Sequence, residues 1–172
     1  MKKLILILVL AISFSEMFAI NSNDSTFVRP LNNINLNFFG DASIISVNYE
    51  RLYFLKPGLF LSFKAGIGYT QEFQLCIFGP CESPPEDYIT FPHHFTFNIG
   101  KKRHFFEFGL GGTIIGGNAS HNYLIYPLAG YRLQPLKSKK LTLRVYGSIP
   151  ITGLETEDII FLPFGLSFGL SF

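Results

Sequence analysis

The last twelve residues, 161–172, constrain the fold more than any other stretch of the chain. Every second residue is large and apolar, and this face consists of Leu162, Phe164, Leu166, Phe168, Leu170 and Phe172. Successive side chains of a β-strand point to opposite sides, so this period predicts a strand with one large apolar face. The opposite face is mostly Gly and Ser, where a strand of a soluble sheet normally carries charged or amide groups.

The composition sets the class of protein. The chain has 172 residues, which predicts one domain, and only 15% of them are charged. The formal net charge is +2. Because nucleic-acid binding requires clustered Lys and Arg on one face, we expect no nucleic-acid partner.

The first nineteen residues, 1–19, have the pattern of a secretory signal peptide. Lys2 and Lys3 precede an apolar run over 4–12, and Ala19 offers a small residue for cleavage. An uncleaved anchor is the alternative, but this run is too short to span a bilayer. Residues 20–31 are polar and show no period, so we expect a periplasmic lead-in.

Seven further segments alternate with a period of two. They are 32–39, 42–54, 59–73, 89–100, 104–116, 122–134 and 141–149. With the last segment they predict eight strands over 32–172, and no apolar run long enough for a membrane helix follows the signal peptide. Membrane strands need about 9–11 residues, and single-chain barrels have even strand numbers from eight upward. A soluble sandwich has similar strand spacing, so further observations must separate the two.

The distribution of side-chain size favours a membrane barrel. The interior of an eight-stranded barrel is just wide enough for side chains to fill. Gly, Ser, Thr and a few charges fit such a lumen, whereas Phe and Leu from every strand would overfill it. The apolar faces therefore point outward, and only lipid accommodates them there.

The connections between the predicted strands separate by charge. One set is short and basic, and carries Lys56, Lys101, Lys102, Arg103, Lys137, Lys139 and Lys140. The alternate set is acidic and mostly longer, and carries Asp41, Glu82, Glu86, Asp87, Glu155, Glu157 and Asp158. An up-and-down topology places the two sets at opposite ends. Short periplasmic turns and longer outer loops are typical of membrane barrels, and eight strands leave both termini on the periplasmic side.

These features resemble the small eight-stranded outer-membrane barrels of the OmpA/OmpX type. The Gly-rich alternating stretches 64–69 and 107–111 and the terminal Gly169-Leu170-Ser171-Phe172 carry the resemblance. It implies a closed antiparallel transmembrane β-barrel in the outer membrane of a Gram-negative bacterium, in contact with lipid and lipopolysaccharide. It also implies that the strand ending in Phe172 is the signal read by the barrel-assembly machinery. We expect no periplasmic domain after the barrel, so a peptidoglycan-anchoring role does not carry over.

Two cysteines lie in the longest predicted outer loop, 74–88. Because the periplasm is oxidising, Cys76 and Cys81 are expected to form a disulfide. A metal site is not expected, since two thiolates need two further ligands and no pattern nearby supplies them. No phosphate-binding glycine loop occurs at a strand-to-helix turn, so we expect no cofactor.

Histidines at two places in the sequence are candidate functional groups. His93 and His94 are consecutive in a strand, so one should face the membrane interface and the other the lumen. Ser120 and His121 lie at the outer rim, where Glu155 or Glu157 could complete the triad of a lipid A acyl-modifying enzyme. Adjacent residues of an extended segment point apart, which argues against triad geometry.

The strand phases turn six charged side chains inward: Glu50, Lys64, Glu72, Glu107, Arg132 and Arg144. Three are acids and three are bases. A buried charge without a partner is costly, so all but Glu72 are expected to form an ion-pair cluster in the periplasmic half of the lumen. Such a cluster would close the barrel to water and fix the strand register. The alternative is that strand tilt separates these groups and each is solvated by water.

Three functions fit the sequence. The first is a non-enzymatic outer-membrane barrel with a structural or surface-contact role. The second is an outer-membrane enzyme that modifies lipid A, and the third is a soluble periplasmic carrier similar to lipocalins.

Overall fold

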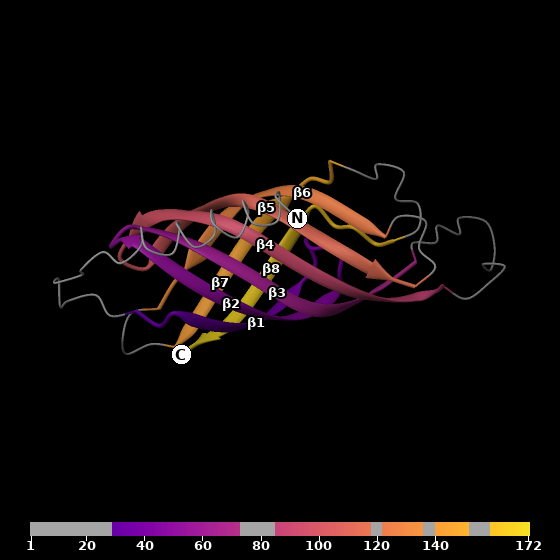
Figure 1. The fold of residues 1–172 in the computed structure, drawn as a ribbon, viewed down its shortest axis with the longest axis horizontal. Helices are drawn as coiled ribbons and strands as arrows, with labels where there is room; N and C mark the ends of the chain where they lie inside the picture. The colour runs from indigo at the N-terminus through magenta and orange to yellow at the C-terminus, as the bar shows by residue number, and fades with distance from the viewer. Residues whose placement is uncertain (1–28, 73–84, 118–121, 136–139, 152–158) are drawn as a thin grey trace, which may run out of the picture.

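The structure is a computed structural model that describes residues 29–72, 85–117, 122–135, 140–151 and 159–172. Within these residues the chain forms strands and no helix, and the strands close into one antiparallel up-and-down barrel (Figure 1). In chain order they are β1 (Asn32–Phe38), β2 (Ile45–Lys56), β3 (Leu59–Gln71), β4 (Asp87–Lys101), β5 (His104–Gly116), β6 (Tyr123–Leu133), β7 (Leu141–Ser148) and β8 (Phe164–Ser171). The predicted all-β, eight-stranded barrel is therefore confirmed.

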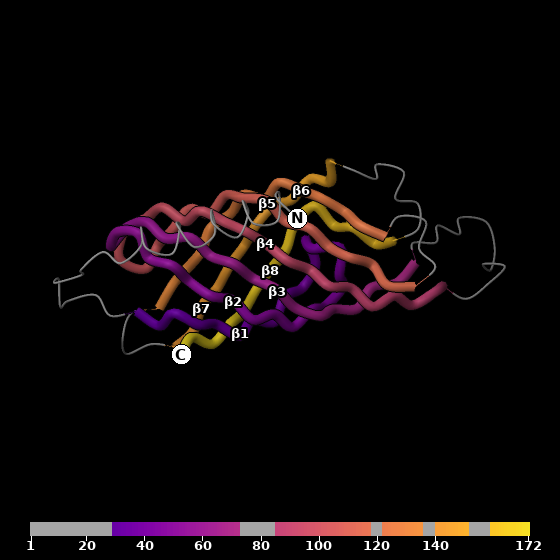
Figure 2. The backbone as a smooth tube through the Cα atoms, viewed as in Figure 1, coloured from indigo at the N-terminus to yellow at the C-terminus, as the bar shows by residue number. Residues whose placement is uncertain are grey.

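The first and last strands complete the barrel wall. β1 pairs with β8 in the register Ile34 opposite Leu170 and Phe38 opposite Leu166 (Figure 2). The ladder continues to the chain end, because Phe172 N donates to Asn32 O at 2.9 Å and Asn32 N donates to Phe172 O at 3.2 Å. Closure leaves neither strand with an open row of main-chain donors and acceptors. No helix in the described residues is long and apolar enough to cross a membrane.

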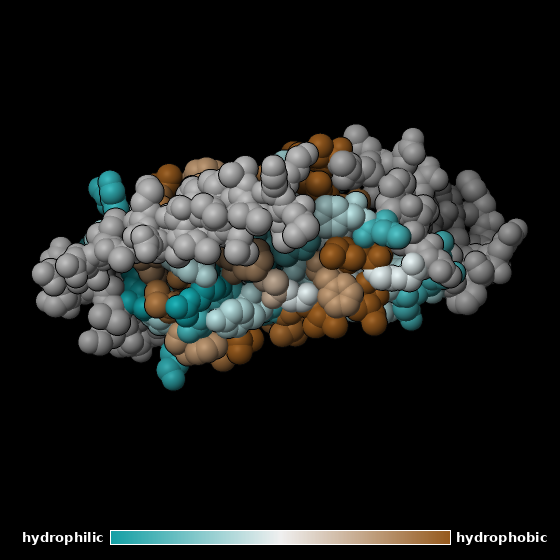
Figure 3. Space-filling model, viewed as in Figure 1, coloured by the Kyte–Doolittle hydropathy of each residue, from teal (hydrophilic) through white to brown (hydrophobic). Residues whose placement is uncertain are grey.

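The alternation along each strand separates an apolar outer wall from a polar lumen. In β4, Phe95, Phe97 and Ile99 are exposed on the outside, whereas Thr96 and Asn98 are fully buried inside. β8 behaves in the same way and exposes the apolar face that the sequence predicted. Figure 3 shows the resulting brown side chains spread along the wall of the barrel on one face.

Strand ends differ from the prediction where the chain leaves the barrel wall. β2 begins at Ile45 rather than at Ala42, and it continues through Lys56, beyond the predicted start of the turn. β3 ends at Gln71, β4 begins at Asp87, and β8 begins at Phe164. β2 starts later than predicted because the backbone before it is left-handed, with φ of 60° at Phe39, 79° at Gly40 and 59° at Ala42. These angles are incompatible with an extended strand.

The segment Phe39–Ile44, here called the inward loop, folds into the lumen at the acidic end of the barrel. Ala42 and Ser43 are buried. The barrel wall holds the loop by hydrogen bonds. They are Thr113 Oγ1 to Asp41 O at 2.7 Å, Ser148 Oγ to Gly40 O at 2.8 Å, Tyr146 OH to Phe39 O at 3.2 Å, and the pair Ser43 Oγ and Thr90 Oγ1 at 2.6 Å. Four side chains from three strands, β4, β5 and β7, thus hold the inward loop in the lumen. The sequence did not predict this plug.

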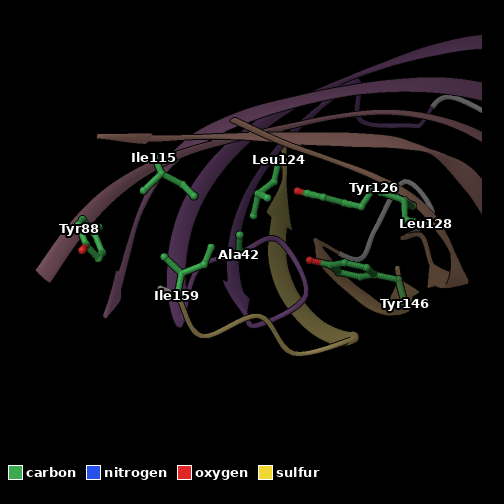
Figure 4. Close-up of a cluster of buried hydrophobic side chains, with 8 residues drawn as sticks. All are labelled: Ala42, Tyr88, Ile115, Leu124, Tyr126, Leu128, Tyr146 and Ile159. Carbon is green, nitrogen blue, oxygen red and sulfur yellow. The ribbon is translucent and has the colours of Figure 1, made fainter. Parts of the chain in front are cut away.

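Apolar side chains fill both ends of the lumen. The larger cluster lies around the inward loop and comprises Ala42, Tyr88, Ile115, Leu124, Tyr126, Leu128, Tyr146 and Ile159. Figure 4 shows the Tyr126 and Tyr146 hydroxyls pointing toward the middle of this cluster. A smaller cluster of Leu52, Phe60 and Phe105 lies at the other end. There the Arg29 guanidinium lies 5.0 Å from the Phe105 ring centroid and donates a hydrogen bond to Lys102 O.

A glycine on the lumen face of β8 makes room for one of these aromatic rings. A Cβ at Gly165 would lie 2.5 Å from Tyr146 Cζ and 2.8 Å from Phe39 O. Gly147, on the outer face of β7, provides the contrast, because the nearest atom to its Cβ would be Pro163 O at 3.6 Å. Gly165 is therefore required by close packing, and Gly147 is not.

We predict that Gly165→Ala lowers the free energy of unfolding by about 1–3 kcal/mol, the usual cost of overpacking a filled interior. Gly147→Ala is the matched control and should change stability little. The measurement is urea unfolding in detergent, followed by the electrophoretic shift between folded and unfolded bands. Equal unfolding midpoints for the two variants would contradict the packing argument.

Candidate functional site

Charged side chains meet in the lumen between the two apolar clusters. Glu50 comes from β2, Glu107 from β5, Arg132 from β6 and Arg144 from β7. Each of the four is at most 2% exposed. They point inward because each occupies the lumen phase of its strand, and the residues before and after it face outward.

The four residues form one continuous chain of ion pairs. Arg132 contacts Glu50 through Nη2, and its Nε lies 3.1 Å from Glu107 Oε2. Arg144 contacts Glu107 through both Nε, at 3.1 Å, and Nη2. The order Glu50–Arg132–Glu107–Arg144 links β2 to strands on the other side of the lumen. Geometry of this kind, with a two-point contact between guanidinium and carboxylate, is the strongest form of such a pair.

Glu107 separates two like charges. Arg132 and Arg144 are direct cross-strand partners in the β6–β7 ladder. Like charges in that position are destabilising unless an acid lies between them. Glu107 contacts both guanidinium groups and supplies that acid.

Glu50 is also bound to the first strand. Its Oε2 accepts hydrogen bonds from Asn33 Nδ2 at 2.8 Å and from Asn35 Nδ2 at 3.2 Å. Both asparagines are fully buried on the lumen face of β1. The acid therefore joins β1 and β2 to Arg132 on β6.

Lys64 pairs with an acid outside the predicted cluster. It is the register partner of Glu50, yet its Nζ pairs with Asp41 Oδ2 at 3.8 Å and lies 5.7 Å from the Tyr146 ring centroid. Asp41 was expected among the acids of an outer loop, and that assignment is wrong. The inward loop carries it into the lumen, where Asn37 and Ser46 donate to its Oδ2, each at 3.0 Å.

Glu72, which the strand phase turned inward, does not reach the cluster. It follows the last residue of β3 and is only partly buried. Its Oε2 accepts a hydrogen bond from Glu86 N at 3.2 Å. Among the described residues, the middle of the lumen therefore holds three acids, Asp41, Glu50 and Glu107, and three bases, Lys64, Arg132 and Arg144, while Arg29 is buried beside the smaller apolar cluster. The sequence anticipated the balance but named Glu72 in place of Asp41.

The two histidines of β4 face opposite sides of the wall, as the alternation predicted. His94 is buried in the lumen, and its Nε2 lies 3.0 Å from Tyr126 OH. His93 lies on the outer surface, where its Nε2 is 2.8 Å from Tyr123 OH and the two rings stack. Within the described ranges, no three His, Cys, Asp or Glu side chains converge to hold a metal ion.

Several predicted residues lie outside the described part of the chain. They are Cys76 and Cys81 of the expected disulfide, Ser120, His121, Glu155 and Glu157 of the rim triad, and the signal peptide 1–19. Phe172, the predicted assembly signal, is described and exposed beside Asn32.

Comparison of the chain with protein-family models, with curated proteins and with solved structures finds no match. What the barrel does is therefore inferred from the geometry of its described residues. That geometry provides a charge-balanced cross-link through the lumen, with an apolar cluster on either side.

We predict that Glu107→Ala lowers the free energy of unfolding by about 3–5 kcal/mol, because it leaves two buried guanidinium groups without their shared acid. Asp87→Ala, on the exposed end of β4, is the control for loss of a carboxylate and should have a much smaller effect. The measurement is chemical unfolding in the same detergent for both variants. An unchanged midpoint for Glu107→Ala would show that the lumen cluster does not stabilise the barrel.

Proposed function

We propose that the chain is an integral β-barrel of the outer membrane of a Gram-negative bacterium, with a structural or surface-contact role and no enzymatic activity. The observation that best supports membrane insertion is the distribution of polar and apolar side chains across the barrel wall. All eight strands expose large apolar side chains outward, and polar or charged side chains occupy the lumen. A soluble barrel has the opposite arrangement.

The extent of the apolar surface supports membrane insertion. Phe106 and Leu110 on β5 are 58% and 57% exposed, and comparable residues continue around the barrel. Each large apolar side chain gains about 1.5–3 kcal/mol when it leaves water. Soluble monomers rarely expose apolar patches of more than a few hundred Å². A lipid bilayer is the environment that would cover the whole apolar outer surface of the strands, here called the apolar belt.

Exposed tyrosines whose hydroxyl groups reach the first residues of strands give the apolar belt polar borders. Tyr49 OH donates to Asn32 Oδ1 at 2.7 Å, and Tyr69 OH donates to Asp87 Oδ1 at 2.6 Å. Asn32 and Asp87 begin β1 and β4, so the two pairs lie at opposite ends of the barrel. Aromatic side chains with a polar tip are enriched at both interfaces of membrane barrels.

The orientation and partners of the barrel follow from this proposal. The short turns β2–β3 and β4–β5 lie at the end where Asn32 and Phe172 meet, and this end would face the periplasm. The opposite end would face the cell exterior and contact lipopolysaccharide. The terminal strand β8, with Phe172, would be recognised by the barrel-assembly machinery.

The alternatives are less well supported. A lipocalin-like carrier needs an apolar cavity, whereas this lumen contains the ion pairs, the inward loop and two packed clusters. A lipid A acyl-modifying enzyme would rely on Ser120, His121 and a nearby acid, which lie outside the described residues. Mass spectrometry of lipid A from cells with and without the protein distinguishes this enzyme from a structural barrel.

We predict that the protein fractionates with the outer membrane of a Gram-negative host and resists carbonate extraction. The unheated protein should migrate differently from the boiled protein in SDS gels, because a closed barrel stays folded in detergent. Recovery as a soluble periplasmic protein with no heat-dependent shift would refute the proposal and favour the carrier.

We also predict no sustained pore conductance when the purified protein is inserted into planar bilayers. The physical reason is that side chains fill an eight-stranded lumen, and here the inward loop adds main chain to it. Regular porin-like current steps from pure protein would show that the lumen is open.

A further inference from the structure

Basic side chains encircle one end of the barrel. Lys56 ends β2, Lys101 ends β4, Lys102 and Arg103 form the next turn, and Lys140 directly precedes β7. Arg51 lies on the outer phase of β2 near the same end, opposite Asn32. These six residues, here called the basic ring, all lie at the end where Asn32 and Phe172 meet.

The basic ring faces solvent and has no acidic counterpart in the described residues. Lys56, Lys101, Lys102 and Lys140 are exposed, and Arg51 and Arg103 are partly exposed. The acidic side chains of the described residues lie elsewhere. Asp41, Glu50 and Glu107 are in the lumen, and Glu72, Glu86 and Asp87 are at the opposite end.

The ring borders the apolar belt directly. Ile99, two residues before Lys101 on the same face of β4, is 52% exposed, and Leu141, next to Lys140, is 67% exposed. A Lys at such a border lays its aliphatic stem along apolar surface and places its ammonium group at the level of lipid headgroups. The ring is therefore positioned to meet phosphate groups in one leaflet.

We propose that the basic ring binds anionic phospholipid headgroups, such as phosphatidylglycerol, in the periplasm-facing leaflet. This inference rests on the proposed membrane insertion of the barrel. The chemistry is ionic pairing of ammonium and guanidinium groups with phosphodiesters, which falls off within about 10 Å at 0.1 M salt. Each Lys or Arg close to an anionic membrane surface strengthens binding by roughly fivefold. The acidic residues Glu72, Glu86 and Asp87 lie at the opposite end of the barrel. The preference for anionic lipid is therefore confined to the leaflet that the basic ring meets.

The test uses the full chain, purified from membranes and reconstituted in phosphatidylcholine vesicles that contain spin-labelled lipid. Electron paramagnetic resonance measures how strongly spin-labelled phosphatidylglycerol associates with the barrel relative to spin-labelled phosphatidylcholine. We expect phosphatidylglycerol to associate several times more strongly at low salt and to lose this preference at high salt. The variant with Lys56→Gln, Lys101→Gln, Lys102→Gln and Lys140→Gln should lose most of the preference.

Two controls separate a local ring from net charge. Replacing the same four lysines by arginine should retain the preference. Glu86→Gln with Asp87→Asn makes the chain more positive at the opposite end and should leave the preference unchanged, because that end is more than a Debye length away. A preference that rises in this variant would show an effect of net charge and overturn the basic ring as the binding surface.

The folded state is checked separately in every sample by the heat-dependent gel shift. A folded, inserted barrel that associates equally with both lipids at low salt would overturn this inference and leave the proposed function intact. A chain that fails to insert into vesicles would instead refute the proposed function. Loss of the preference in the arginine variant would equally contradict an ionic headgroup site.

Discussion

Closure of the hydrogen-bonded ladder between β1 and β8 is the constraint on which the rest of the structure depends. In an apolar environment each main-chain N–H and C=O must find its partner within the protein, and a sheet achieves this only without edges. Eight strands closed in this way leave a narrow lumen. Everything that points inward must therefore fit in little space and satisfy its own polar groups. The small inward residues, the paired charges and the glycine beneath Tyr146 are consequences of that requirement.

The lumen is layered along the barrel axis. Apolar clusters lie at both ends, and the charged cluster lies between them, shielded from bulk water. Burial of charges is unfavourable unless each has partners, so the cluster is stable only as a set. The inward loop contributes to this set by carrying Asp41 to Lys64. The barrel is thus held together through its centre as well as around its wall.

The alternation in the sequence was enough to predict the strands, their outward faces and the inward direction of Glu50, Glu107, Arg132 and Arg144, because side-chain period alone decides these features. It was not enough to predict the inward loop. A loop that enters the lumen depends on left-handed angles at Phe39 and Ala42 and on donors from distant strands. For the same reason Asp41 was assigned to the outside. The partner of a charge also depends on such a loop, because the inward loop places Asp41 beside Lys64 although Glu50 is the register neighbour of Lys64.

The position of Glu107 between two arginines has a consequence for assembly. A β6–β7 hairpin formed alone would hold Arg132 and Arg144 opposite each other with no acid between them. That repulsion is relieved when β5 lies alongside and Glu107 reaches both groups. Contact with β5 therefore favours the pairing of β6 with β7, and we expect these three strands to fold cooperatively. A side chain buried in the finished lumen in this way influences the order in which the wall is built.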